Sequence, residues 1–223
     1  NPGAVLTTPG TSLFVAYYGS SQLWHYSLDP ATGAPSSGFH AHPVSYPYAM
    51  GRTADSKFLF TTSWEWASPS PQPASSFAVN PETGGLGPVS APSAELLPAF
   101  LAVHPAGAML YVTNYGSNSI TRFRFDPNIG VLNSALNSPG PVHPLGITIH
   151  SNGRFAYVAG YTEGRIVTYS IDPDSGGLTE TSSVPKPGTH FIALHAQHDA
   201  NDPPVVTAGR DRWVTVGQSA ALH

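Results

Sequence analysis

The residues with the clearest chemical potential lie in Pro- and Ser-rich segments between hydrophobic runs. The segment WEWASPSPQPASS, residues 64–76, contains Trp64, Glu65 and Trp66. An exposed Trp beside a carboxylate can stack on a sugar ring or another apolar ligand. We therefore take Trp64 and Trp66 as candidate ligand-binding residues, although packing of Trp66 within its own loop is the simpler interpretation.

One histidine and two carboxylates are candidates for acid–base chemistry: His190 with Glu65 or Glu95. The groups would have to lie within about 3 Å of one substrate atom or of a bridging water. The chain contains no G-x-S-x-G, H-E-x-x-H, Walker or dinucleotide-binding motif. Catalysis by His190 and Glu65 is therefore the weaker hypothesis, and binding is the stronger one.

The ten His residues raise the question of a metal site. His104, His150 and His195 recur at equivalent positions, so we expect them to form hydrogen bonds in turns. His40 and His42 project the same way from an extended segment, but the sequence suggests no third ligand for a metal. We predict no metal and no other cofactor.

The composition excludes several classes of function. Nine Lys and Arg residues are scattered singly in a chain of net charge −4, so no basic stripe is available for nucleic acid. No apolar run approaches the roughly 20 residues of a membrane-spanning helix. Because the chain has no Cys, disulfides, thiolate catalysis and Cys-ligated metals are excluded. The 22 Gly and 23 Pro favour an all-β protein with many turns.

A repeat of 46 residues organises the chain. Its first marker is an Asx-Pro pair, with intervals of 51, 46 and 46 residues between Asp29, Asn80, Asp126 and Asp172. Its second marker is an aromatic residue at the end of a hydrophobic run, with intervals of 46, 51 and 46 residues between Tyr18, Trp64, Tyr115 and Tyr161. The second repeat thus has a five-residue insertion after Trp64. Because Trp64 occupies a repeated position, we expect it in the core.

Each repeat contains four short runs rich in β-branched and aromatic residues, which predict four antiparallel strands. In D-P-x-x-G, the Asx side chain, the Pro and the Gly suit the turn from the third strand to the fourth. Four strands per repeat form the blade of a β-propeller. We predict a propeller over residues 1–200, with complete repeats at 1–40, 41–91, 92–137 and 138–183 and a partial fifth strand at 190–195.

The alternation of strands predicts where a ligand would bind. The loops between second and third strands emerge on the same face as the linkers between repeats. Loops on a rigid scaffold commonly carry recognition. On this face we expect a small-molecule, glycan or protein ligand to meet the enlarged loop and three linker residues: Glu95, His143 and Lys186.

The residues after the last repeat have two interpretations. The segment NDPPVVTAGRDRWVTVGQSAALH, residues 201–223, resembles the start of a PKD-type immunoglobulin-like domain. This resemblance implies a chain cut from a longer, secreted multidomain protein. Alternatively, PVVTAG pairs with RWVTVG as a degenerate fifth blade.

The stretch FLAVHPAGAMLYVTNYGSNSITRFRFDPNIGVL, residues 100–132, resembles the lactonase family of propellers, which includes 6-phosphogluconolactonases and muconate-lactonising enzymes of the same fold. The resemblance covers all four repeats and implies a ring of seven blades. It also implies a His and an Arg before innermost strands, facing the central channel. His190 stands at such a position, whereas the equivalent residues are Tyr48, Ala99 and Leu145, so the Arg is missing.

Our leading hypothesis is a non-catalytic binding or assembly module of an extracellular or cell-surface bacterial protein. The alternatives are a lactone hydrolase that acts through His190 and a carbohydrate-binding propeller that uses Trp66. Four repeats leave either a small ring or an open arc. Because an open arc exposes blade faces and strand edges, we also expect self-association.

Overall fold

The computed structural model describes residues 2–8, 12–36, 40–188, 192–195, 205–208 and 212–215, and its side chains within 12–36 and 40–188. Almost all regular structure in these ranges is β-strand, with one short 3-10 turn, η1 (Tyr18–Ser20). No helix in these ranges has the length and apolar character needed to cross a membrane.

Four sheets, each of four antiparallel strands, follow one another along the chain. Sheet 1 contains β1 (Pro2–Thr8), β2 (Ser12–Tyr17), β3 (Gln22–Ser27) and β4 (His40–Pro43). Sheet 2 contains β5 (Pro47–Arg52), β6 (Phe58–Ser63), β7 (Ala74–Val79) and β8 (Leu86–Ser90). Sheet 3 contains β9 (Pro98–Val103), β10 (Met109–Asn114), β11 (Ser119–Phe125) and β12 (Leu132–Pro139). Sheet 4 contains β13 (Pro144–Ile149), β14 (Phe155–Gly160), β15 (Arg165–Ile171) and β16 (Leu178–Pro185). The predicted all-β fold with four-stranded blades is confirmed.

A fifth sheet of three strands follows: β17 (Ile192–His195), β18 (Val205–Ala208) and β19 (Arg212–Thr215). β18 pairs antiparallel with both β17 and β19. This is the pairing that a further blade requires. The immunoglobulin-like interpretation of residues 201–223 stays a prediction, because most of that segment lies outside the described residues.

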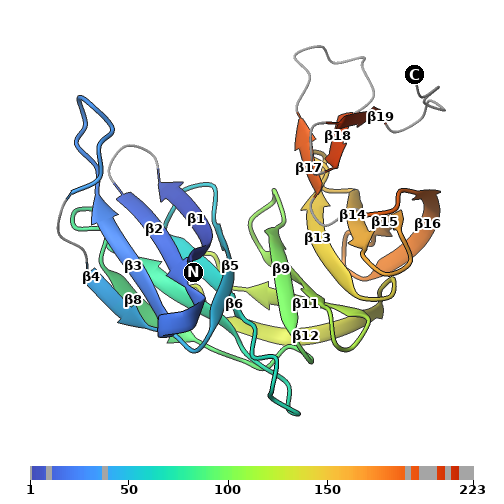
Figure 1. Cartoon of the computed structure of the whole chain (residues 1–223), viewed down its shortest axis with the longest axis horizontal. Helices are drawn as coiled ribbons and strands as arrows, with labels where there is room; N and C mark the ends of the chain where they lie inside the picture. Colours follow the sequence, from blue (N-terminus) through green and yellow to red (C-terminus); the bar gives the residue numbers. More distant parts are fainter. Residues whose placement is uncertain are drawn as a thin grey trace.

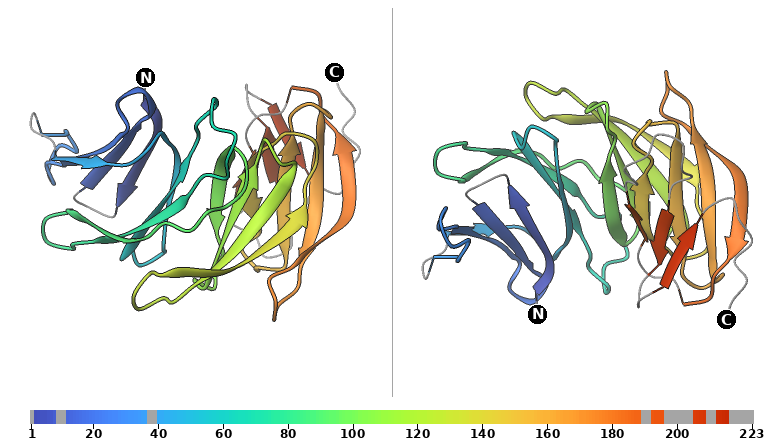
Figure 2. Two further views of the ribbon diagram at one scale, coloured as in Figure 1. Left: turned by 90° about the horizontal axis from the view of Figure 1, so that it is seen from below. Right: turned by 90° about the horizontal axis from the view of Figure 1, so that it is seen from above.

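The sheets stand side by side in an arc, with sheet 1 at one end and sheet 5 at the other (Figure 1). The first strands of consecutive sheets contact one another: β1 with β5, β5 with β9, β9 with β13 and β13 with β17. The views from below and above show neighbouring sheets packed face against face (Figure 2). This arrangement is that of consecutive propeller blades, with the first strand of each sheet innermost.

The hydrophobic core lies between the sheets rather than within them. One cluster joins Phe14 and Leu23 of sheet 1 to Leu59 and Phe77 of sheet 2. Equivalent clusters join sheet 2 to sheet 3 and sheet 3 to sheet 4. Period-two alternation along each strand supplies both faces. Each sheet is therefore stabilised mainly by its neighbours, as expected for repeats that cannot bury their faces alone.

The turns from third to fourth strands have the predicted Asx geometry. The side-chain oxygen Oδ1 accepts one or two backbone N–H bonds at 2.7–3.0 Å in each turn: at Asp29, Asn80, Asp126 and Asp172. The glycine four residues later has a φ of 70–73° in all four: Gly33, Gly84, Gly130 and Gly176. The prediction that these residues are structural is confirmed.

These third-to-fourth turns, together with the turns between first and second strands, form one end of the sheets, which we call the turn end. The loops between second and third strands and the linkers between sheets form the other, which we call the loop end.

Candidate functional site

The linkers between sheets fix three aromatic residues at the loop end. In the β4–β5, β8–β9 and β12–β13 linkers, one non-Gly residue has a positive φ: Tyr46 (42°), Leu97 (52°) and His143 (53°). The carbonyl of each accepts a hydrogen bond from the backbone N–H of the aromatic residue after the next sheet's second strand: Trp64 (2.9 Å), Tyr115 (2.9 Å) and Tyr161 (3.1 Å). A positive φ is uncommon for such residues, so its recurrence in three repeats indicates that the fold requires it.

These aromatic side chains form a continuous surface, the aromatic platform, which we define by six residues: Tyr48, Trp64, Trp66, Tyr115, His143 and Tyr161. The Trp64 ring lies 4.8 Å from that of Tyr48, 5.1 Å from Tyr115 and 6.1 Å from Trp66, centroid to centroid. Tyr115 stacks on His143 at 4.3 Å and lies 6.4 Å from Tyr161. The platform thus spans sheets 2 to 4.

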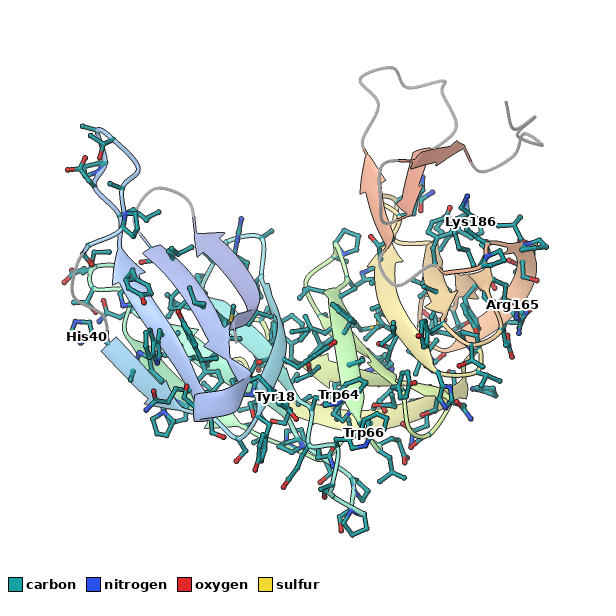
Figure 3. The ribbon with its side chains drawn as sticks, viewed as in Figure 1. Tyr18, His40, Trp64, Trp66, Arg165 and Lys186 are labelled. Carbon is teal, nitrogen blue, oxygen red and sulfur yellow. The ribbon has the colours of Figure 1, made fainter. Side chains whose placement is uncertain are left out.

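Trp66 is the most exposed ring of this surface, followed by Tyr161 at 40%. Trp66 is 65% exposed and lies almost parallel to Trp64, at 17°. Figure 3 places both side chains together near the middle of the arc. Trp64 is only half-buried, so its assignment to the core was wrong. The reason is that the linkers hold this repeated aromatic position at the loop end, beyond the faces that pack between sheets.

Gln72 anchors the enlarged β6–β7 loop that carries Trp64 and Trp66. Its side chain is 4% exposed and its amide Nε2 donates to the carbonyls of Ser70 (2.9 Å) and Glu65 (3.4 Å). Its Oε1 accepts the backbone N–H of Leu97 at 3.1 Å. The loop is therefore attached to the β8–β9 linker, and Trp66 is exposed on an anchored segment.

The two predicted carboxylates have different surroundings. Glu95 accepts hydrogen bonds from Asn137 Nδ2 at 2.5 Å and from Ser117 Oγ at 3.5 Å, so it is part of sheet 3 packing. Glu65 lies between the two Trp residues in sequence, and among the described side chains none donates a hydrogen bond to its carboxylate. Glu65 is the carboxylate nearer to the platform along the chain, whereas Glu95 is occupied by a structural role.

The remaining predicted site residues are brought together only in part. His143 belongs to the platform, where its Nδ1 lies 2.5 Å from Thr162 Oγ1 and its backbone N–H donates to Asn118 Oδ1 at 2.8 Å. Lys186 lies toward the far end of the arc, near Arg165 and away from the two Trp residues (Figure 3). His190 lies outside the described residues, so its pairing with Glu65 stays a prediction.

The histidines that we assigned to turns behave as predicted where they are described. His104 Nδ1 accepts the N–H of Ala106 at 3.1 Å, and His150 Nδ1 accepts that of Asn152 at 3.1 Å. His104 Nε2 also lies 2.9 Å from the carbonyl of Gly153, which links sheet 3 to sheet 4. The side chain of His195 is not among those described. Across the described ranges, no three His, Asp or Glu side chains are arranged to hold a metal ion.

The platform suits binding to the apolar face of a ring. Burial is the main reason that the pKa of Tyr48 is raised, with a smaller contribution from Tyr18, so its phenol is neutral and can donate a hydrogen bond at neutral pH.

Sequence reasoning identified Tyr115 and Tyr161 as repeat markers but missed their part in a surface. The signal was present, because the 46-residue period stacks these positions on adjacent sheets.

Residues 59–203, well over half of the chain, match the profile of the lactonase family, described as seven-bladed β-propellers. The chain belongs to this family. None of the curated protein sequences matches this lactonase-family chain.

Three solved structures have folds similar to that of this chain. Proposed 6-phosphogluconolactonases from Bacteroides fragilis and Bacteroides uniformis have TM-scores of 0.76 and 0.77 and are 20% and 18% identical, with 86% and 84% of this chain covered. The periplasmic gluconolactonase PpgL of Pseudomonas aeruginosa has a TM-score of 0.74 and 20% identity, with 85% of this chain covered. The aligned part is only 55–56% of each of these proteins. At these identities the likeness establishes the fold alone.

Proposed function

We propose that this lactonase-family propeller is a binding module that takes a cyclic hydroxylated ligand, of the class of sugars and sugar lactones, on its aromatic platform. The observation that carries the proposal is the pair of nearly parallel indoles, of which Trp66 is 65% exposed. A large exposed apolar surface on an anchored loop marks an interaction site. Indole faces stack on the C–H faces of sugar rings, and the polar edge of an aromatic surface orients the hydroxyls.

The polar groups around the platform support a hydroxylated ligand rather than a purely apolar one. Glu65 stands between the two Trp residues in sequence, His143 stacks on Tyr115 and supplies an imidazole edge, and Tyr48 stacks on Trp64 and supplies a neutral phenol. A sugar ring presents both an apolar face and hydroxyls, so it matches this combination of groups. A ligand without hydroxyls would leave the polar groups without new partners.

Titration of the intrinsic Trp fluorescence tests this proposal. Probes are glucose, maltose, N-acetylglucosamine and gluconolactone, with the wild type and Trp66→Ala compared. We expect saturable quenching by at least one probe and a loss of about tenfold in affinity on substitution, because a stacked ring is removed. The matched control is Ile129→Ala, since Ile129 is 57% exposed but lies in a turn at the opposite end of sheet 3. If no probe binds, or if both substitutions act equally, the platform is not the binding site.

Lactone hydrolysis is the second candidate, and the family match favours it. The structures with similar folds include proteins named as gluconolactonases, and His190 stands where the family resemblance implies a channel-facing His. Proton release from gluconolactone can be followed in a pH-stat with the wild type and His190→Ala. Acceleration that disappears on substitution would support hydrolysis, whereas binding without acceleration would support a non-catalytic module.

We also propose that the module belongs to a secreted multidomain protein and self-associates through the ends of the arc. The residue pattern of 201–223 supports an immunoglobulin-like PKD-type domain after the propeller. Association is supported by the open arc, because the outer face of sheet 1 has no neighbouring sheet among the described residues and exposed blade faces and strand edges invite pairing. Sedimentation equilibrium over a range of concentrations is the test, and a mass equal to one chain at all concentrations would contradict self-association.

A further inference from the structure

A cavity of about 370 Å³ lies at the loop end between sheets 1 and 2. Its walls come from the end of β4 and the β4–β5 linker on one side, and from the ends of β6, β7 and β8 on the other. Its volume falls within the usual range for small-molecule sites, roughly 300–1,000 Å³. It lies beside the attachment points of the enlarged β6–β7 loop, because Ser63 and Pro73 are among its lining residues.

The corresponding space between sheets 2 and 3 is filled by side chains. There Asn114 Nδ2 donates to Thr121 Oγ1 at 2.8 Å, Thr121 Oγ1 donates to Asn137 Oδ1 at 2.8 Å, and Asn137 Nδ2 donates to Glu95 at 2.5 Å. These four residues form a hydrogen-bonded chain that runs from the linker into the interface between the sheets. The polar groups of this interface are thus largely satisfied within the protein.

In the preceding repeat, three of these positions hold smaller side chains. By the 46- and 51-residue offsets, Ser63 corresponds to Asn114, Ser75 to Thr121 and Ala91 to Asn137. All three of these smaller residues line the cavity. The cavity between sheets 1 and 2 therefore corresponds to the space that the hydrogen-bonded side chains of Asn114, Thr121 and Asn137 occupy between sheets 2 and 3.

One buried hydroxyl in the cavity has no partner. Ser63 is 1% exposed, and its Oγ makes no hydrogen bond to any described residue. A buried hydroxyl without a partner costs free energy, so such groups are normally satisfied by water or a ligand. Nearby, Ser76 Oγ lies 2.8 Å from Ser90 Oγ, which adds a pair of hydroxyls to the same wall.

The lining chemistry limits the class of ligand. The lining combines serine hydroxyls with the apolar surfaces of Val44, Pro73, Phe77 and Pro88, and it includes no ionisable side chain. A charged ligand would lose its hydration there without gaining a counter-charge. A neutral ring with hydroxyls and C–H faces can satisfy both kinds of surface.

We propose that this cavity is a second binding site, separate from the aromatic platform, for a neutral hydroxylated ligand of monosaccharide or disaccharide size. Ser63 Oγ is its buried hydrogen-bonding group, and the Pro and Phe surfaces pack against the ring.

The test uses isothermal titration calorimetry of Trp66→Ala protein, so that the platform contributes least. Probes are glucose and maltose, with gluconate as the charged counterpart of glucose. In this background, Ser63→Asn combined with Ala91→Asn rebuilds the filled arrangement of sheet 3. We expect saturable binding of glucose or maltose and no binding of gluconate. The filled variant should lose more than tenfold in affinity. Its thermal midpoint should stay at or above that of its parent, because a cavity is filled.

Ser63→Ala keeps the cavity open and removes only the hydroxyl, so it serves if the filled variant does not fold. It is expected to weaken binding about fivefold, the effect of one neutral hydrogen bond. The proposal is overturned if neither neutral probe binds, if gluconate binds as well as glucose, or if binding is the same in the filled and Ser63→Ala variants as in their parent. Failure of the platform proposal gives a different result, because Trp66→Ala would then leave wild-type affinities unchanged.

Discussion

The two ends of the sheets use the repeat in opposite ways. At the turn end, four Asx turns share their residue types, their side-chain hydrogen bonds and their glycine conformation. At the loop end, three linkers share a positive φ, but the residues that adopt it are Tyr46, Leu97 and His143. The backbone repeats at both ends, whereas the side chains repeat only at the turn end. Variation is thus concentrated where a ligand can reach it.

Packing between sheets adds a constraint on three of the four turns at the turn end. The Gly84 turn of sheet 2 lies against His25 and Ser12 of sheet 1, and the Gly130 turn of sheet 3 lies against Phe58 of sheet 2. The Gly176 turn approaches Met109 and Tyr111 in the same way, and Tyr111 donates its hydroxyl proton to the Gly176 carbonyl at 2.9 Å. Each of these three turns therefore contacts the preceding sheet and also closes its own.

The largest expected effect comes from adding a methyl group at such a contact. In Gly130→Ala, the new Cβ would lie 2.3 Å from Phe58 Cδ1 at a φ of 73°. We expect a loss of about 3 kcal/mol in the free energy of unfolding, from the left-handed backbone and from overpacking. Gly33→Ala is the matched control, because Gly33 has a φ of 71° but no atom within 4 Å of the added Cβ. It should lose only about 1 kcal/mol.

Urea denaturation of both variants separates the two contributions. Equal losses would mean that the contact between the Gly130 turn and Phe58 adds nothing, and that the turn end is uniform because of its backbone alone.

Much of the fold could be predicted from the sequence because the same residue types recur at the positions that determine the turns and the strand order. Asx, Pro and Gly specify the turns, and the aromatic markers give the period that places strands side by side. Trp64 was misassigned because a repeated aromatic position is equally compatible with a core or an end of the sheets. The choice depends on the linker conformation at Tyr46, and no residue type in that linker signals a positive φ.

The cavity was not predicted for a related reason. Ser63, Ser75 and Ala91 are ordinary residues in the sequence, and each is small only in comparison with its counterpart in the next repeat. Because the three residues come from β6, β7 and the β8–β9 linker, their shared space appears only in three dimensions. Comparison of repeats position by position, rather than search for motifs, is the sequence method that would find such a site.

An intermediate effect is expected at the loop end, where one residue fixes the enlarged loop. Gln72→Ala removes two donated hydrogen bonds and leaves the backbone N–H of Leu97 without its acceptor. We expect a loss of about 2 kcal/mol in stability, the usual cost of leaving a buried polar group unpaired. Ser68→Ala in the same loop is the control and should change stability by less than about 0.5 kcal/mol. Similar urea midpoints for the two variants would show that the loop is held by other contacts.

The smallest expected effect is a response to acid at the contact between sheets 1 and 2. His25 is 1% exposed, its Nε2 lies 3.1 Å from Ser12 Oγ, and among described residues its Nδ1 has no partner. Burial, followed by the nearby His40 and His42, lowers the pKa of His25 below its usual 6.5, and burial and His40 lower that of His42. The native state therefore binds fewer protons than the unfolded state.

The sign of the effect follows from these lowered pKa values. The contribution of neutral His25 to the free energy of unfolding is fully present above pH 6.5, the usual pKa of His. This contribution is lost as the pH falls from 6.5 toward the lower pKa that His25 has in the native state. Each unit of difference between the unfolded and native pKa corresponds to about 1.4 kcal/mol. Urea midpoints at several pH values should fall on acidification, and the fall should be shallower in His25→Gln. An unchanged slope in His25→Gln would mean that the contact of the Gly84 turn with sheet 1 does not depend on a neutral imidazole.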